Sequence, residues 1–300
     1  MAWLELSLTL RAEQQQRIEG ALEDLGALAV TLQDADVDTP DERAIFEPGV
    51  GETPLWASLQ LQALFDADAD RAGLVAALLE LVPELEPDQL RFRTVEDQEW
   101  TRAWMDTYRP MAFGRRLWIY PWNLEPPADL GADTVIVRLD PGLAFGTGTH
   151  PTTALCLEWL DAQDLAGATV VDYGCGSGVL AIAALKLGAA RVIGVDLDPQ
   201  ALDASRDNAQ RNGVAERLEV LLPAAYAPTP QPFFVANILA GPLAELAPLF
   251  AASVAPGGRL ALSGILAGQQ DELLVRYGEW FDALDVTERD GWLRIAGRRR

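Results

Sequence analysis

The segment Asp172-Tyr173-Gly174-Cys175-Gly176-Ser177-Gly178, followed by VLAIAALKL at 179–187, decides the fold class of this chain. An apolar run at 168–171 leads into the glycine-rich turn, and a second apolar run after the helix-forming residues ends at Asp196. This order predicts a strand, a turn, a helix and a second strand. Glycines have no Cβ, so the backbone of such a turn can approach a ligand closely. The segment therefore predicts an α/β fold with a site for a nucleotide-like ligand.

The spacing of the glycines narrows the class of ligand. A dinucleotide-binding turn needs a glycine at position 179, where this chain has Val179. The pattern D-x-G-x-G-x-G, with an acid at the end of the next strand, resembles motif I of S-adenosylmethionine (AdoMet) methyltransferases. In that family the turn lies behind the methionine and sugar of AdoMet, and the strand-end acid holds both ribose hydroxyls. The alternative for Asp196 is a helix-capping role before Asp198-Pro199.

Length and composition indicate where the protein works. The chain has 300 residues, of which 49% are hydrophobic, enough for one full core and a smaller one. It has no apolar run of about 18 residues, and its start resembles an amphipathic strand more than a signal peptide. Two cysteines do not make a disulfide framework. We expect a cytoplasmic protein with no membrane segment.

The charge balance bears on partners. Asp and Glu number 45 against 23 Lys and Arg, which gives a formal charge of −22. Such a surface repels nucleic-acid phosphates and attracts basic partners. The alternative is that the acidity only keeps the protein soluble. We expect no direct nucleic-acid binding and a monomer in solution.

The first third predicts a small α+β domain over residues 1–95. Its strands and helices are predicted in the order βαββαβ, the ferredoxin-like arrangement, at 4–10, 13–25, 28–32, 56–65, 70–81 and 90–95. Residues 96–116 are predicted to link this domain to the rest of the chain. Trp100, Trp104 and Tyr108 would form an aromatic stripe on a helix at 96–109, which Pro110 ends. The alternative is that this stripe simply packs on a neighbouring domain.

Residues 117–300 predict a mostly parallel sheet covered by helices on both faces. Strands are predicted at 135–139, 170–172, 191–195, 218–221, 233–236, 259–263 and 292–295. Helices are predicted at 152–160, 179–187, 199–212, 243–252 and 269–281. Together with the resemblance to motif I, which implies the class I AdoMet methyltransferase type, this pattern leads us to expect a seven-stranded Rossmann-like domain.

A second candidate segment, LDPGLAFGTGTHPTTALCL at 139–157, precedes the glycine-rich turn. Pro151 suits the first turn of a helix. The backbone amides of that turn, with Thr152 and Thr153, can bind an anionic group such as the carboxylate of AdoMet. The alternative is a capped helix after a glycine-rich loop.

Four motifs together are very similar to the PrmA family, the ribosomal protein L11 methyltransferases. They are GLAFGTGTHPTT, DYGCGSG, GVDLDPQALDASRDNAQRNGV and VANILAGPL, and the resemblance runs essentially end to end. It implies that AdoMet donates methyl groups to the α-amine and lysine ε-amines of L11, up to trimethylation, leaving S-adenosylhomocysteine. It also implies that the small first domain recognises L11 and that the linker lets this domain swing.

Carried over residue by residue, the family's AdoMet contacts fall on Thr153, Gly174, Asp196 and Asn237. Phe145, Gly146, Thr147 and Gly176 lie beside them in the two loops. Asn237 is also the candidate catalytic residue, because it would orient the accepting amine. Many amino methyltransferases have N-P-P-Y at this position, whereas this chain has Ile238-Leu239 after the asparagine, as the PrmA family does.

Other chemistries have little support. His150, the only histidine, is a candidate base, although a loop or capping role fits it better. One histidine and no paired cysteines argue against a metal site, and Cys175 has no neighbouring base in the sequence. Three alternatives stay open at this point: a lysine methyltransferase with another basic substrate, a nucleotide-cofactor oxidoreductase, and a non-enzymatic AdoMet-binding module.

Overall fold

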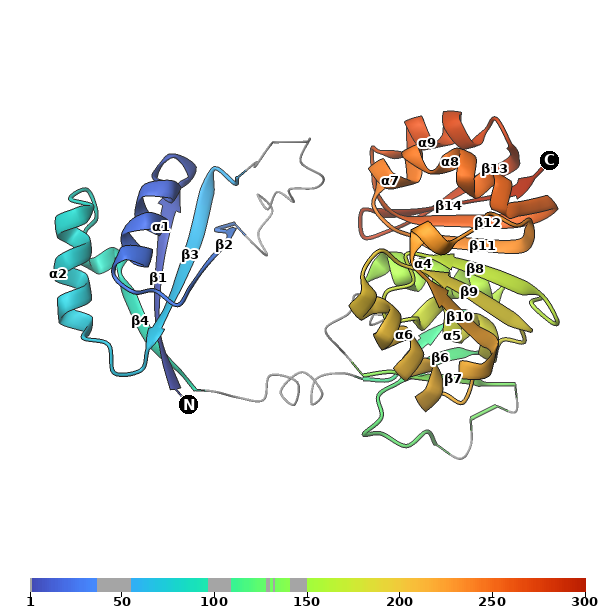
Figure 1. Cartoon of the computed structure of the whole chain (residues 1–300), viewed down its shortest axis with the longest axis horizontal. Coiled ribbons are helices and arrows are strands. Elements are labelled where there is room, and N and C mark those ends of the chain that lie inside the picture. Colours follow the sequence, from blue (N-terminus) through green and yellow to red (C-terminus); the bar gives the residue numbers. More distant parts are fainter. Residues whose placement is uncertain (1, 37–54, 97–108, 128–129, 132, 141–149) are drawn as a thin grey trace. The chain divides into compact units, whose positions relative to one another are not determined.

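The computed structural model describes residues 2–36, 55–96, 109–127, 130–131, 133–140 and 150–300. The chain divides into two compact units, Met1–Glu99 and Trp100–Arg300 (Figure 1). No helix among the described residues is both long and apolar enough to cross a membrane. The predicted aromatic stripe at 100, 104 and 108 falls on residues 97–108, outside the described part of the chain.

The first unit has the predicted βαββαβ order. Its elements are β1 (Ala2–Arg11), α1 (Gln15–Asp24), β2 (Ala29–Asp34), β3 (Ser58–Asp66), α2 (Arg71–Leu81) and β4 (Arg91–Glu96), with 3-10 turns η1 (Ala12–Gln14) and η2 (Pro87–Gln89). The strands form an antiparallel sheet in the order β2-β3-β1-β4. This is the ferredoxin-like arrangement.

Leucines at every second position of β1 form part of the hydrophobic core of this unit. Leu4, Leu6, Leu8 and Leu10 are buried together with residues of α1 and α2, because every second side chain of a strand lies on the same face. On the other face Glu5 is also nearly buried, and it accepts two hydrogen bonds from the Arg93 guanidinium at 2.5 and 2.8 Å. The pair neutralises a charge that would otherwise be costly to bury.

The second unit contains two sheets. Its strands are β5 (Met111–Phe113), β6 (Leu117–Tyr120), β7 (Val135–Arg138), β8 (Thr169–Tyr173), β9 (Arg191–Val195), β10 (Leu218–Leu221), β11 (Gln231–Asn237), β12 (Val254–Leu266), β13 (Phe281–Arg289) and β14 (Trp292–Arg299). Within residues 150–300, seven strands form one sheet in the order β10-β9-β8-β11-β12-β14-β13. The strands from β10 to β12 are parallel to their neighbours, and β14 runs antiparallel to both β12 and β13. The predicted seven-stranded Rossmann-like sheet is confirmed.

Helices cover both faces of this sheet (Figure 1). They are α4 (Pro151–Asp161), α5 (Val179–Lys186), α6 (Pro199–Arg211), α7 (Ala240–Glu245), α8 (Ala247–Ser253) and α9 (Gln270–Tyr277), with 3-10 turns η3 (Ala215–Arg217) and η4 (Pro223–Ala225). Val170 belongs to the core under α4 and α5, whereas its neighbour Val171 belongs to the core under α7, α8 and α9. Both faces of β8 are therefore buried, which is typical of a parallel sheet.

Three expectations about individual elements were wrong. The strand expected at 135–139 is β7, which pairs with β6 in a separate three-stranded sheet, β5-β6-β7. The strand that completes the large sheet is β13, whose first residue was expected to end a helix at 269–281. The single helix expected at 243–252 is divided into α7 and α8, and Pro248 lies in the first turn of α8, where its missing N–H costs no helical bond.

The expected linker also has different ends. Glu96 is the last residue of β4, and Met111–Phe113 is a strand of the second unit's small sheet, so a helical linker cannot fill 96–116. Gly114 and Asp161 hold this region to α4. The buried Asp161 carboxylate accepts a hydrogen bond from the Arg115 amide at 2.6 Å and one from the Arg116 side chain at 3.2 Å. A Cβ at Gly114 would lie 2.4 Å from that carboxylate.

Candidate functional site

The candidate site lies where the chain reverses direction across the large sheet. The chain passes from β8 outward to β9 and β10, and it then returns to place β11 on the other side of β8. In open α/β sheets, ligands bind at the carboxyl ends of the strands at this reversal. Asp196 directly follows β9 and Asn237 ends β11, so the fold brings these predicted site residues to the same edge.

The glycine-rich turn connects β8 to α5. Gly174, Gly176 and Gly178 have φ angles of 80°, 53° and 79°, in the left-handed region that residues with a Cβ seldom adopt. The amides of Gly174 and Cys175 both donate to the Val195 carbonyl, at 2.7 and 3.1 Å. The turn is thereby fixed to the end of β9.

Asp196 joins the turn to the next loop. Its Oδ2 accepts a hydrogen bond from the Gly176 amide at 2.8 Å, and its Oδ1 accepts one from the Asp198 amide at 3.0 Å. The helix-capping alternative for Asp196 is wrong for α6, because Asp198 caps that helix by accepting from the Gln200 amide at 2.9 Å. A carboxylate has about four acceptor positions, so the partly exposed Asp196 keeps acceptor capacity for hydroxyl groups.

Thr153 and Asn237 meet although 84 residues separate them. Thr153 lies in the first turn of α4 and is fully buried. The Asn237 side-chain amide donates to its hydroxyl at 3.3 Å. Phe145, Gly146 and Thr147, also predicted at the site, lie outside the described residues. The structure thus brings together Gly176 with Asp196, and Thr153 with Asn237.

His150 is the N-cap of α4. Its Nδ1 accepts from the Thr152 amide at 3.3 Å and lies 2.7 Å from the Thr152 hydroxyl, and its ring packs edge-on against Trp292 at 4.7 Å. Burial lowers its pKa because the charged imidazolium is poorly solvated there. The capping role expected from the sequence is confirmed, and one amide of the expected carboxylate site is already occupied by this histidine.

Asp172 is the acid that begins the D-x-G-x-G-x-G pattern, and the sequence does not predict its environment. It is fully buried, its Oδ2 accepts from the Ala181 amide at 3.0 Å, and its Oδ1 has no hydrogen-bond partner among the described residues. Burial, together with the negative charge of Asp196, raises the pKa of Asp172 to about 7, although the Ala181 amide opposes this shift. This buried carboxyl group, two residues before Gly174, is therefore only partly ionised at neutral pH.

Side chains of α6 hold the turn from the other side, and the sequence reasoning missed them. Ser205 donates to the Gly176 carbonyl at 2.9 Å, and Asn208 donates to the Ser177 carbonyl at 2.9 Å. Asn212 accepts from the Arg138 amide and donates to the Arg138 carbonyl, both at 2.8 Å, as a neighbouring strand would. The sequence signal for these contacts was the helical spacing of the polar residues at 205, 208 and 212, which places them on one face of the helix.

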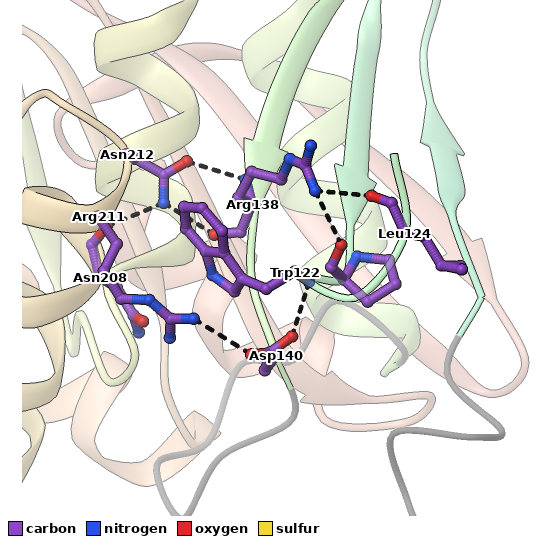
Figure 2. Close-up of polar contacts among 8 residues, drawn as sticks. Trp122, Leu124, Arg138, Asp140, Asn208, Arg211 and Asn212 are labelled. Atoms are coloured by element: carbon purple, nitrogen blue, oxygen red, sulfur yellow. Dashed lines mark hydrogen bonds and ion pairs between the residues drawn. The ribbon is translucent and has the colours of Figure 1, made fainter. Parts of the chain in front are cut away.

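Figure 2 shows the contacts of Arg211 and Asn212 with Arg138, Asp140 and Trp122, near the end of α6 and the end of β7. The Arg211 guanidinium lies 4.4 Å from the centre of the Trp122 ring and also reaches Asp140 at 3.3 Å. Arg138 approaches the same ring at 5.6 Å, so two cations contact one indole. Asp140 in turn accepts from the Trp122 amide at 2.8 Å. One helix thus anchors both the turn and the strand that leads toward residues 141–149.

These residues fit AdoMet. A Cβ at Gly174 would lie 2.2 Å from Ile238 Cγ2 and one at Gly178 would lie 2.9 Å from the Ser205 hydroxyl, so the turn leaves no room for side chains. Asp196 offers a charged acceptor, and one oxygen of Asp172 has no partner in the part of the chain that the structure describes. Burial raises the pKa values of Cys156 and Cys175 to about 12, so neither thiol is ionised for nucleophilic chemistry at neutral pH.

Comparisons with known proteins agree with this site. The family model described as "Ribosomal protein L11 methyltransferase (PrmA)" matches residues 2–300. The chain is 60% identical to a ribosomal protein L11 methyltransferase of Stenotrophomonas maltophilia and 57% identical to one of Xylella fastidiosa, each over 100% of both chains. A crystal structure of a ribosomal protein L11 methylase from Lactobacillus delbrueckii subsp. bulgaricus matches with a TM-score of 0.57 and 33% identity. It covers 64% of this chain and 100% of that one.

Two alternatives that the sequence left open are therefore wrong, namely a nucleotide-cofactor oxidoreductase and a non-enzymatic AdoMet-binding module. The match extends over both units, and the fold and the glycine-rich turn are those of a class I AdoMet-dependent enzyme. The chain belongs to the ribosomal protein L11 methyltransferase (PrmA) family, and it is an AdoMet-dependent methyltransferase.

Proposed function

We propose that this enzyme transfers methyl groups from AdoMet to amino groups of ribosomal protein L11, namely its α-amine and lysine ε-amines, up to trimethylation. The observation that carries the proposal is the full-length match to proteins named ribosomal protein L11 methyltransferases. The pairing of Asn237 with Thr153 beside the glycine-rich turn supports it from the site.

In this proposal the chain's residues hold AdoMet as follows. The backbone of Gly174 and Gly176 lies against the methionine and sugar, and Asp196 accepts from the ribose hydroxyls. Thr153 and Asn237 bind near the reacting end, and Phe145, Gly146 and Thr147 complete the set. Asp196 suits this role because its carboxylate is already oriented by two backbone amides, so little ordering is needed on binding.

AdoMet supplies a methyl group on a positively charged sulfur, which is already a good donor. The chain's task is to present a neutral amine along the line of attack and to exclude water. An α-amine of pKa about 7.8 is roughly one-tenth neutral at pH 7, whereas a lysine of pKa about 10.4 is neutral about once in 2,500. Asn237, the proposed catalytic residue, orients the amine, and a partly buried site disfavours the ammonium form.

The charge distribution supports a basic protein substrate. Residues 1–99 contain 22 acidic and 6 basic residues, a net charge of −16, whereas residues 100–300 contain 23 and 17, a net charge of −6. Ribosomal proteins are typically basic because they bind RNA phosphates. We therefore propose that the first domain, which ends with β4, recognises L11, and that the chain between β4 and β5 links it to the catalytic domain.

The remaining proposals concern the state of the protein in the cell. We infer a cytoplasmic monomer that contacts L11 without contacting nucleic acid directly. Both cysteines are free and buried, which is compatible with a reducing compartment. The net negative charge disfavours contact with RNA or DNA.

A labelling experiment tests the substrate. Ribosomal proteins from cells that lack this enzyme are incubated with the purified chain and AdoMet labelled in its methyl group, and the labelled bands are identified. We expect label in L11 with the wild-type chain and with Asp203→Ala, an exposed acid on α6. Asp196→Ala should label L11 much more slowly at low AdoMet, because loss of a charged acceptor costs about 1.5–3 kcal/mol of binding. Label in a different basic protein, with none in L11, would support the lysine methyltransferase alternative and contradict the proposal.

A further inference from the structure

Strand β12 contains an irregularity next to the candidate site. Ser263 pairs with Arg294 and Ile265 pairs with Leu293, so Gly264 is an extra residue between two consecutive pairs. Its φ is 86°, in the left-handed region. An extra residue of this kind is a β-bulge, and bulges are frequent beside active sites, where they redirect the chain.

The bulge lies directly beneath the residue that follows Asn237. A Cβ at Gly264 would lie 2.2 Å from the Ile238 carbonyl oxygen and 2.7 Å from its carbonyl carbon. The Ile238 amide also donates to the Ser263 carbonyl at 3.1 Å. Because the obstructing atoms belong to the backbone, no change of side-chain rotamer can make room for a larger residue at 264.

The side chain of Ile238 makes a second close contact. Its Cγ2 would lie 2.2 Å from a Cβ at Gly174, in the turn proposed to hold AdoMet. Two glycines, Gly264 in β12 and Gly174 after β8, therefore both lie close to one residue. Asn237 immediately precedes it and donates to the buried Thr153 hydroxyl at 3.3 Å.

We propose that Gly264 is a positioning residue for methyl transfer. Its bulge fixes the backbone of Ile238, whose side chain packs on the glycine-rich turn, and this arrangement sets the position of the Asn237 side chain beside Thr153. The inference rests on the proposed role of Asn237 in the reaction. Gly264 itself touches neither the donor nor the acceptor in this account, and it acts through Ile238.

The test compares Gly264→Ala with Gly268→Ala. Both glycines have a positive φ, 86° and 101°, so both substitutions introduce backbone strain, but a Cβ at Gly268 meets no heavy atom within 4 Å. We expect turnover of L11 at saturating AdoMet to fall on the order of a hundredfold in Gly264→Ala, because a displacement of about 1 Å at the reacting atoms has that effect. Gly268→Ala should keep wild-type turnover. Equal losses in both variants, or full turnover in Gly264→Ala, would overturn the proposal.

A second readout does not depend on the substrate. The side-chain amide signals of Asn237 in an NMR spectrum can be identified by their disappearance in Asn237→Ala. They should shift in Gly264→Ala and stay in place in Gly268→Ala. If wild-type protein fails to methylate L11 while these shifts occur, the proposed function fails and the positioning role of Gly264 stands. If the signals stay in place in Gly264→Ala, the positioning role fails whatever the substrate.

Ile238→Ala provides the test if Gly264→Ala does not fold. It removes the side chain that contacts the turn and leaves the backbone contact with Gly264. Turnover should fall on the order of tenfold through loosened alignment, while AdoMet affinity, measured by calorimetry, changes less than turnover does. Unchanged turnover in a folded Ile238→Ala protein would overturn the proposal.

Discussion

At the scale of single residues, Asp172 near the end of β8 and Asp196 just after the neighbouring β9 differ in burial and in hydrogen-bond partners. Asp196 is partly exposed and accepts two backbone amides, whereas Asp172 is fully buried and has one amide partner. Burial dominates for Asp172, so its carboxyl group holds its proton near neutral pH. The sequence motif contains both acids, but only the packing distinguishes the partly exposed carboxylate from the buried one.

This difference predicts a pH dependence of stability. The pKa of Asp172 is raised from 3.8 to about 7 in the folded chain, so the folded state binds this proton more tightly than the unfolded state does. The resulting stability is complete below pH 4 and is lost as the pH rises through 7. Between pH 5 and 7.5 the loss should be roughly 2 to 3 kcal/mol, at about 1.36 kcal/mol per pKa unit.

Denaturant unfolding of the wild type and Asp172→Asn at both pH values measures this loss. The stability of the variant relative to the wild type should rise over that range, because asparagine does not titrate. The comparison of variant with wild type also cancels the opposite contribution of His150, whose pKa is lowered. Parallel curves for the two proteins would show that Asp172 does not titrate between pH 5 and 7.5, which would contradict a pKa near 7 in the folded chain.

At the scale of elements, α6 is more than a cover for the sheet. Ser205 and Asn208 donate to carbonyls of the glycine-rich turn. Asn212, at the end of the helix, hydrogen-bonds to both the amide and the carbonyl of Arg138 in β7. The peptide groups of the turn are therefore oriented from outside the turn. A turn that is preorganised in this way loses less entropy when it binds a ligand.

Asn208→Ala should therefore weaken AdoMet binding. One hydrogen bond is worth about 0.5–1.5 kcal/mol, so the Kd for AdoMet should rise about two- to tenfold, as measured by calorimetry. Gln210→Ala changes an exposed residue of the same helix and should leave the Kd unchanged. A lowered thermal midpoint in Asn208→Ala with an unchanged Kd would show that the contact supports only the fold.

Periodicity predicted most elements because their buried faces are regular. Leu4, Leu6, Leu8 and Leu10 alternate as expected, and the strand at 191–195 was predicted with its observed bounds. Strand β13 was missed because it is an edge strand, mostly exposed and interrupted by a bulge between Asp282 and Asp285. Its side chains carry no clear alternation.

The site was predictable only in part, because some of its contacts join residues that are far apart in the chain. Motif spacing and family resemblance indicated Asp196, Thr153 and Asn237, and the fold brings them to one edge of the sheet. Gly264 was not indicated, because its importance depends on a backbone 26 residues away in the chain. The sheet membership of β7 was likewise not predictable, since Asn212 rather than a strand covers its edge.

At the scale of the whole molecule, the acidic charge is distributed unevenly. The first 99 residues carry −16 of the total −22. If this charge attracts L11, the KM for L11 should rise steeply with salt, because the Debye length falls from about 10 Å at 0.1 M to about 3 Å at 1 M. The KM for AdoMet should change little, since hydrogen bonds within a site are screened less. Initial rates at several salt concentrations measure both, and a KM for L11 that does not depend on salt would exclude electrostatic attraction as the basis of recognition.

Peptide mass spectrometry of L11 from cells with and without this enzyme tests directly whether the chain methylates L11. The account predicts methylated α-amine and lysine peptides in the first strain and unmodified peptides in the second. Returning the wild-type gene should restore the methyl groups, whereas a gene encoding Asn237→Ala should restore them poorly although the protein is folded. Identical L11 peptides in the two strains would contradict the claim that this chain methylates L11.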